Sequence, residues 1–137
     1  MNPHIIKNPK LAETCISKTQ YFEKFLANTD YVLCNVSAAE YIGLCNWTTA
    51  PEVYVYTKQE CVQNHIEILS DGYLWYTTVN QTINDLLKDN TIDEQVILES
   101  LAELYFKNNY ADLKIQPENQ KAFDEFRPYA ESYYTQV

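Results

Sequence analysis

A chain of 137 residues, 46% hydrophobic and 21% charged, is long enough to fold as one domain with a hydrophobic core and is not typical of a disordered protein. A net charge of −9, with a single arginine and no cluster of lysines, argues against direct binding of DNA or RNA. Two glycines are too few for a glycine-rich phosphate-binding loop, so we expect no nucleotide cofactor, and nothing else in the sequence indicates a cofactor.

The cysteine spacing and the lengths of the apolar segments predict the cellular compartment of the protein. The four cysteines form no CxxC pair and have no histidine at ligand spacing, so the sequence gives no support for a metal site. The N-terminus lacks the apolar core of a secretory signal, and no stretch approaches about 20 apolar residues. We therefore expect a cytoplasmic protein with reduced cysteines and no membrane contact.

The first third of the chain predicts helices around one short extended piece. Residues 1–10 form a polar arm, and apolar residues at helical spacing predict a helix over 11–27. Between Asp30 and Asn35, the sequence YVLC predicts a short extended segment or a buried connector leading into the next helix. Ser37 is positioned to cap a short helix that ends at Gly43.

The middle of the chain predicts the sheet. The runs 52–57, 62–69 and 73–79 are rich in β-branched and aromatic residues. Between the last two runs, Asp71-Gly72 is the strongest hairpin signal in the sequence. A small, mainly antiparallel sheet of about three strands is the expected result.

The remaining chain returns to helical spacing. A helix is predicted from residue 80 to about residue 90, and Thr91 with Glu94 matches a capping box that opens the next helix. Pro117 suits the first turn of a last helix within a C-terminal helical segment, 116–137, which Pro128 should break or kink. The sequence thus predicts a single α+β domain over 1–137, with helices on both sides of the sheet in chain order.

Two local patterns resemble a known family. VSAAEYIGL at 36–44, followed by PEVYVYT at 51–57, resembles the "SALYLHGL … PEKIYVT" passage of the type IV antitoxins of abortive-infection toxin–antitoxin systems. TTVNQTINDLL at 77–87 resembles the "ERTLLDLL" segment of that family, and TIDEQVILESLAELYFKNNY looks like its next helix. The resemblance covers roughly residues 30–115.

The resemblance implies a bacterial or phage-borne, transcriptional-regulator-like protein whose partner is a nucleotidyltransferase-like toxin. Members of the family usually begin with a winged-helix DNA-binding domain, and the residues before residue 30 are neither long nor basic enough to form one. In addition, Gln81 stands where the family has arginine, and Ile42 where it has histidine. The part that remains resembles the antitoxin body, a binding module without a DNA reader.

The candidate site residues favour surface contact over catalysis. Tyrosine and tryptophan are enriched where proteins bind proteins, so the aromatic residues around the predicted helix–sheet junction are the candidates for partner binding. Three polar residues are expected to act structurally, with Asp85 on the inner face of its helix and bonded to Thr82 or a backbone group. The partner-binding candidates are Tyr41, Trp47, Tyr54, Tyr56 and Trp75, and the structural polar residues are Ser37, Thr82 and Asp85.

Two other functions stay open at this stage. One is a transcriptional regulator that acts through a separate DNA-binding partner. The other is a small nuclease-like or hydrolytic enzyme, for which acids and a lysine around the predicted strands, or His65, would supply the chemistry. The acids and lysine in question are Glu52, Lys58, Glu60 and Glu67. We expect no enzyme, no catalytic residue and no metal, and the sequence leaves the oligomeric state open.

Overall fold

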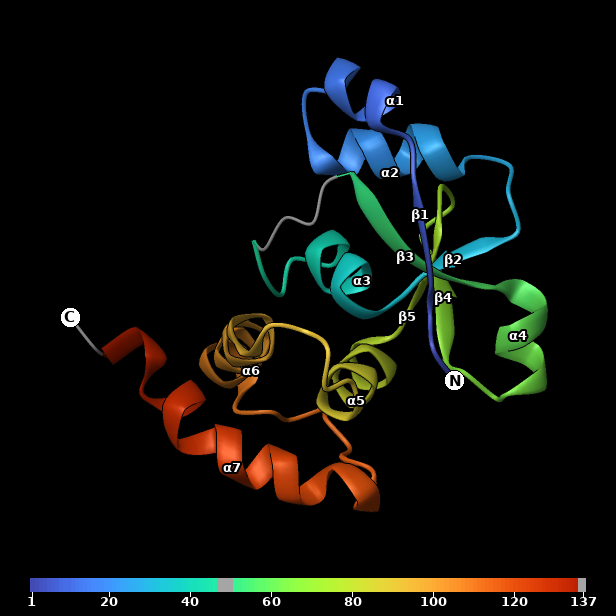
Figure 1. Cartoon of the computed structure of the whole chain (residues 1–137). Helices are drawn as coiled ribbons and strands as arrows, with labels where there is room; N and C mark the ends of the chain where they lie inside the picture. The colour runs from blue at the N-terminus through green and yellow to red at the C-terminus, as the bar shows by residue number, and fades with distance from the viewer. Residues whose placement is uncertain (47–50, 136–137) are drawn as a thin grey trace.

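The computed structural model describes residues 1–46 and 51–135 as an α+β fold around one sheet (Figure 1). The sheet has five strands in these residues, in the order β1-β3-β2-β5-β4. Strands β2 and β5 are parallel, and the other neighbouring pairs are antiparallel. The strands are β1 (His4–Lys7), β2 (Tyr31–Leu33), β3 (Glu52–Thr57), β4 (Ile68–Ser70) and β5 (Trp75–Thr77). The α+β class is therefore confirmed, whereas a mainly antiparallel sheet of about three strands matches only roughly.

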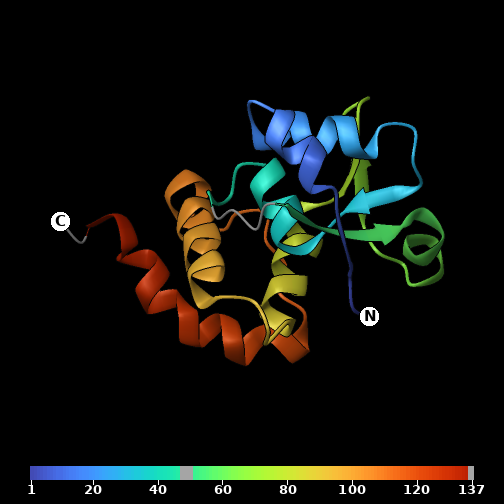
Figure 2. The same ribbon diagram turned by 45° about the horizontal axis from the view of Figure 1, so that its top comes forward.

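The helices divide into those that cover the sheet and those that pack beyond it. Figure 1 shows α4 on one side of the sheet and α1 to α3 on the other. Figure 2 shows α5 and α6 side by side, with α7 crossing below them. The helices are α1 (Pro9–Thr14), α2 (Lys18–Leu26), α3 (Asn35–Tyr41), α4 (Lys58–Gln63), α5 (Val79–Lys88), α6 (Glu94–Asn108) and α7 (Gln120–Glu131), with single 3₁₀ turns η1 (Pro117–Asn119) and η2 (Tyr133–Thr135).

Side chains alternate between the two faces of the central strands, and both faces are buried. Val53 and Val55 of β3 point toward α2 and α3, where they pack with Phe22. Tyr56 points to the opposite face and packs with Cys61 of α4. A third apolar cluster joins α3 to α5, α6 and α7. Helix α3 therefore lies between the sheet and the helical layer and contacts both.

Strand β1 corrects the prediction of a polar arm over 1–10. His4 to Lys7 pair with Glu52 to Val55 as an edge strand, and Pro9 already belongs to α1. The sequence HIIK gives a weak local signal because the segment is short and lies at the sheet edge, with Ile5 57% exposed. Its structure comes from pairing with a strand about fifty residues away.

The predicted helix over 11–27 is two helices. Helix α1 ends at Thr14, and α2 begins after Ser17, whose hydroxyl accepts a hydrogen bond from the backbone N–H of Gln20. Ile16, at the break, is 91% exposed, so it does not continue the apolar face. A serine cap inside a helical pattern is the signal that separates the two helices.

The predicted strand over 62–69 is wrong for most of its length. Thr57 and Glu60 form a capping box that opens α4, and only Ile68 to Ser70 pair as strand β4. Within α4, Cys61 is buried while Val62 is 73% exposed. The sequence VQNHIEIL contains apolar residues typical of a strand, but the capping box before it starts a helix, and the prediction did not include that cap. The hairpin around Asp71-Gly72 is confirmed, since β4 and β5 pair as neighbours.

Three predicted helix boundaries also change. Helix α3 begins after Cys34, without a side-chain cap, so Ser37 lies inside the helix. Asp93, and not Thr91, caps α6 by accepting from the N–H of Gln95. Helix α7 continues through Pro128 to Glu131, only a few residues beyond the proline. A proline inside a helix removes one hydrogen bond, to the carbonyl four residues before it, and α7 continues for only three residues after Pro128.

Ser100, in the helical layer, is a buried residue whose replacement should change the stability of the protein. Its side chain is fully buried on α6, and its hydroxyl has no hydrogen-bond partner among the residues that the structure describes. Ser100→Ala is expected to raise the free energy of unfolding by about 1 kcal/mol, because it removes an unsatisfied buried polar group. Urea denaturation measures the change. Ser17→Ala is the contrasting variant and should lower stability by about 1 kcal/mol through loss of a cap; a loss of stability in Ser100→Ala would contradict the prediction.

Candidate functional site

A cleft of about 670 Å³ lies between the sheet and α5. Its walls come from α5 and the loop that follows it, from β3, from the start of α3 and from the segments 1–3 and 64–66. Residues from both ends of the fold therefore meet here, which no local sequence pattern indicates. Figure 1 shows the N-terminus beside α5 at this place.

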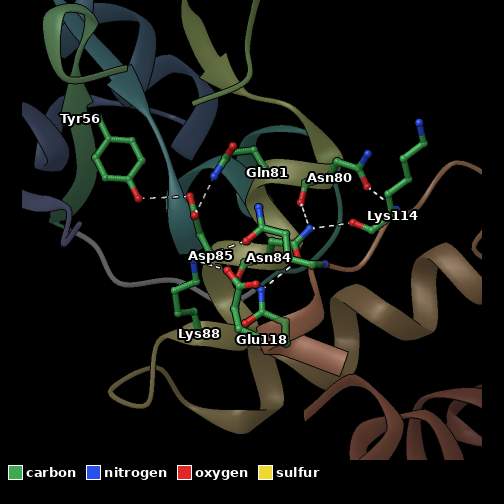
Figure 3. A network of polar contacts seen from close by, with 10 residues as sticks. Tyr56, Asn80, Gln81, Asn84, Asp85, Lys88, Lys114 and Glu118 are labelled. Carbon is green, nitrogen blue, oxygen red and sulfur yellow. Dashed lines mark hydrogen bonds and ion pairs between the residues drawn. The ribbon is translucent and has the colours of Figure 1, made fainter. Parts of the chain in front are cut away.

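Asp85 of α5 lies at the inner wall of the cleft. One of its carboxylate oxygens accepts from the side-chain N–H of Gln81 at 2.9 Å, and the other accepts from the hydroxyl of Tyr56 at 3.2 Å. Figure 3 shows both donors pointing at the carboxylate. Burial raises the pKa of Asp85, although both hydrogen bonds, and more weakly Lys88 and the amino group of Met1, act in the opposite direction. Burial also raises the pKa of Tyr56, and the negative charge of Asp85 adds to this.

Asp89 forms a second fixed carboxylate one helical turn further along. The side-chain amide of Asn35 donates to one of its oxygens at 3.1 Å, and the N–H and hydroxyl of Thr91 donate to the other at 2.9 and 2.6 Å. Asn35 is buried and has φ of 53°, a left-handed backbone conformation that asparagine tolerates better than most residues. His65, also on the cleft wall, has φ of 54°. Two non-glycine residues in strained conformations thus line one cleft.

Lys88, the lysine on the cleft wall, has its amino group turned to the C-terminal segment. It lies 3.5 Å from the side-chain oxygen of Gln116 and 3.5 Å from a carboxylate oxygen of Glu118. Figure 3 shows Lys88 beside Glu118, below Asp85. Both partners of the ion pair are more than half exposed, so this pair contributes little to stability.

Next to the cleft, α5 carries a further polar network centred on Asn84, which reaches the cleft lining through Gln116. The buried side chain of Asn84 donates to the carbonyl of Lys114 at 3.0 Å and accepts from the N–H of Gln116 at 2.9 Å and from the side chain of Asn119 at 2.9 Å. Asn80 accepts from the N–H of Lys114. These contacts, seen in Figure 3, fix the segment before η1 against α5.

The four predicted partner-binding aromatics that the structure describes do not form one surface. Tyr54 and Tyr56 both line the cleft, although Tyr56 exposes only 2% of its area. Tyr41 packs on Tyr76 at 5.4 Å between ring centroids, on the other face of the sheet, and its hydroxyl donates to Asp71. Trp75 is 38% exposed, and the amino group of Lys58 lies 5.2 Å from its ring centroid. Trp47 lies outside the described residues.

The polar residues expected to be structural all make internal hydrogen bonds. The hydroxyl of Ser37 accepts from the N–H of Tyr54 at 2.8 Å and so joins α3 to β3. Thr82 is fully buried and shares a hydrogen bond with Thr77 at 2.7 Å. Asp85 does not bond to Thr82, because its carboxylate points to Tyr56 and Gln81 on the cleft side.

Two of the residues considered for a nuclease-like site, Glu60 and Glu67, are hydrogen-bonded to other groups. Glu60 accepts from His4 and from the N–H of Thr57, and Glu67 accepts from the hydroxyl of Thr78. No group of three or more potential metal ligands of the His, Cys, Asp and Glu types comes together in residues 1–46 and 51–135. Within the same residues, none of the helices has both the length and the apolar character needed to cross a membrane.

Sequence reasoning identified part of this cleft. It singled out Asp85, Tyr54 and Tyr56, and considered His65, but missed Asn35, Lys88 and Asp89. For Asp89 a signal existed, because a residue four positions after Asp85 occupies the same helix face. For Asn35 the sequence offered no signal, since its contact with Asp89 joins segments about fifty residues apart.

Comparison with known proteins identified no relative of this chain: no family model, no curated protein and no solved structure matches it.

Proposed function

We propose that this chain is a non-enzymatic interaction protein of the cytoplasm that binds and restrains a protein partner. The observation that carries the proposal is the cleft beside α5, where fixed carboxylates, amides and a tyrosine hydroxyl meet at a wall that also holds the exposed Ile5. Small-molecule sites are mostly apolar cavities with few polar groups. Protein interfaces carry about ten direct hydrogen bonds, and the fixed polar groups of this cleft, with Ile5 beside them, can supply some of these.

The charge of the chain supports a basic partner. With a net charge of −9, the protein attracts a positively charged surface over a distance of about 10 Å at ordinary ionic strength. The resemblance of residues 30–115 to the antitoxin body suggests that this partner is a nucleotidyltransferase-like toxin. Both arguments concern association, and neither requires a catalytic group on this chain.

Co-expression with the product of the adjacent gene tests the proposal. We expect the two proteins to co-elute in size-exclusion chromatography at about 0.15 M salt and to separate more readily at about 0.5 M, because salt screens charge attraction. Growth of the host should recover when this chain accompanies the partner. Growth recovery without a complex would show that the chain acts without contacting the partner and would contradict the proposal. The absence of both a complex and growth recovery would contradict it as well.

A further inference from the structure

We propose that the cleft beside α5 receives an arginine side chain of the protein partner. The inference rests on the proposed function, because it names the group through which that partner is held. It goes further by assigning a recognition role to Asp85 and Asp89, which lie four positions apart on the α5 side of the cleft.

The first argument is that both carboxylates are already held in place. Each of their oxygens accepts at least one hydrogen bond from a neighbouring side chain or backbone group. A carboxylate oxygen can accept about two hydrogen bonds, so both oxygens of Asp85 and the Oδ2 of Asp89 retain capacity for a further donor. The Oδ1 of Asp89 already accepts two hydrogen bonds from Thr91. Because Tyr56, Gln81 and Asn35 fix these groups before binding, little side-chain entropy is lost when a ligand arrives.

The second argument is the direction of α5. This ten-residue helix ends at Lys88 with its C-terminal turn at the cleft wall. The C-terminal end of a helix carries partial negative charge from its carbonyl groups and favours cations within the last turn. The helix end and the two carboxylates are therefore all negatively charged, and all of them attract a cationic ligand.

The third argument is the position of the local cations. The amino group of Lys88 lies 3.5 Å from the side-chain oxygen of Gln116 and 3.5 Å from a carboxylate oxygen of Glu118, and no hydrogen bond or ion pair joins it to Asp85 or Asp89 among the contacts of the described residues. The amino group of Met1 acts on Asp85 as well, although burial outweighs both cations and leaves the pKa of Asp85 raised. Asp85 thus bears a desolvation cost that a closer cation would offset.

Arginine suits this cleft better than lysine. Its planar guanidinium has five N–H donors in a fixed fork and can bond to two carboxylates one helical turn apart, whereas an ammonium is a compact point charge. Tyr54 lines the same cleft and offers an aromatic ring against which a guanidinium can stack. The opposite charge of the ligand also agrees with the basic partner expected from a net charge of −9.

Nuclear magnetic resonance titration of the full chain with N-acetyl-arginine amide tests the inference. We expect saturable shifts, with a dissociation constant in the millimolar range for so small a ligand, at the backbone amides of Asn35 and of residues 81–91. N-acetyl-citrulline amide has nearly the same shape without the charge and should bind at least about tenfold more weakly. Equal binding of the two ligands, or shifts that do not saturate or lie elsewhere, would overturn the inference.

Variants of the two carboxylates provide the matched comparison. Asp85→Asn and Asp89→Asn should each weaken arginine amide binding by about tenfold, while Asp112→Asn, an exposed acid outside the cleft, should leave it unchanged. If Asp85→Asn does not fold, Asp89→Asn and the citrulline ligand decide the question. Lys88→Met should tighten binding about twofold to threefold by removing a competing cation. Equal affinities for Asp89→Asn and Asp112→Asn would contradict the assignment.

The same variants separate this inference from the proposed function. Should the partner co-elute equally well with wild type and with the Asp85→Asn/Asp89→Asn double variant, protein binding would stand and arginine docking in this cleft would be wrong. Should the arginine amide bind as expected while no complex with a partner forms, the cleft assignment would stand and the proposed function would fail.

Discussion

Replacing Asn84 by alanine is expected to lower the free energy of unfolding by about 3 kcal/mol, because the change leaves at least two backbone groups of the C-terminal segment without their partner. Asn84 is 3% exposed and bonds to the carbonyl of Lys114 and the N–H of Gln116. Alanine can replace neither bond. A truncation of this size in a buried network is among the few kinds of substitution that exceed 2 kcal/mol.

Urea denaturation measures the total effect, and amide hydrogen exchange shows where it acts. Asn84 holds the segment before η1 against α5, so the backbone amides of α7 should exchange faster in Asn84→Ala than in wild type. The exchange rates of the β3 amides should rise less, because they follow only the change in global stability. Asn90→Ala, an exposed amide just after the same helix, is the control and should shift stability by less than about 0.5 kcal/mol. Wild-type exchange throughout α7 would show that Asn84 does not hold this segment.

The Asn84 network also shows which parts of the fold the sequence reveals. Helix α5 follows from apolar spacing, and its cap, Thr78, is a residue type that favours helix starts. Strand β3 was predicted with its observed bounds, 52–57, since β-branched and aromatic residues follow one another there. The β4–β5 hairpin follows from Asp71-Gly72, where Gly72 has φ of 92°. Each of these signals is local.

The parts that the sequence did not reveal depend on contacts between distant segments. Strand β1 forms because His4 to Lys7 pair with β3. Four residues at a sheet edge are too few to show a clear strand pattern in the sequence. The parallel pairing of β2 with β5 joins segments about forty residues apart. Apolar periodicity cannot specify such a neighbour, so the sheet was predicted smaller than it is.

The candidate site divides in the same way. An acid on an otherwise apolar helix face marked Asp85 as a residue that needs partners, and this reasoning uses only the helix itself. Its partner Tyr56 lies on β3, twenty-nine residues before it in the chain, and reaches it only when the sheet and α5 come together. The cleft as a whole is therefore a product of tertiary structure, although one of its central groups was visible in the sequence.

A second large effect is expected from pH. Glu40 on α3 lies 3.9 Å from the amino group of Lys18 on α2, with its side chain 6% exposed. Among the residues that the structure describes, its other carboxylate oxygen has no hydrogen-bond partner. Burial raises the pKa of Glu40 from 4.5 to about 7, and the attraction to Lys18 only partly opposes this. An ion pair at this distance without a hydrogen bond does not repay the cost of desolvation.

The raised pKa determines the direction of the pH dependence. The folded state holds the proton of Glu40 up to about pH 7, whereas the unfolded state releases it near pH 4.5. Stability from this group is therefore fully present below pH 4.5 and is lost as the pH rises to about 7, by an amount of about 3 kcal/mol. Asp85 adds a loss of the same sign, because burial raises its pKa too. The lowered pKa values of Glu60 and Asp71 act at pH values below about 4.5, outside this range.

Urea denaturation between pH 5 and 8 separates the contribution of Glu40 from the others. Glu40→Gln should remove most of the decline, so that the variant gains stability relative to wild type as the pH rises. Because the variant leaves Lys18 without its partner, the double variant Lys18→Met/Glu40→Gln removes both charges and should show the same flat profile with a higher baseline. Glu13→Gln, at an exposed carboxyl of α1, should follow wild type. If Glu40→Gln retains the wild-type slope, Glu40 ionises as readily in the folded protein as in the unfolded chain, and its burial beside Lys18 has no energetic consequence in this range.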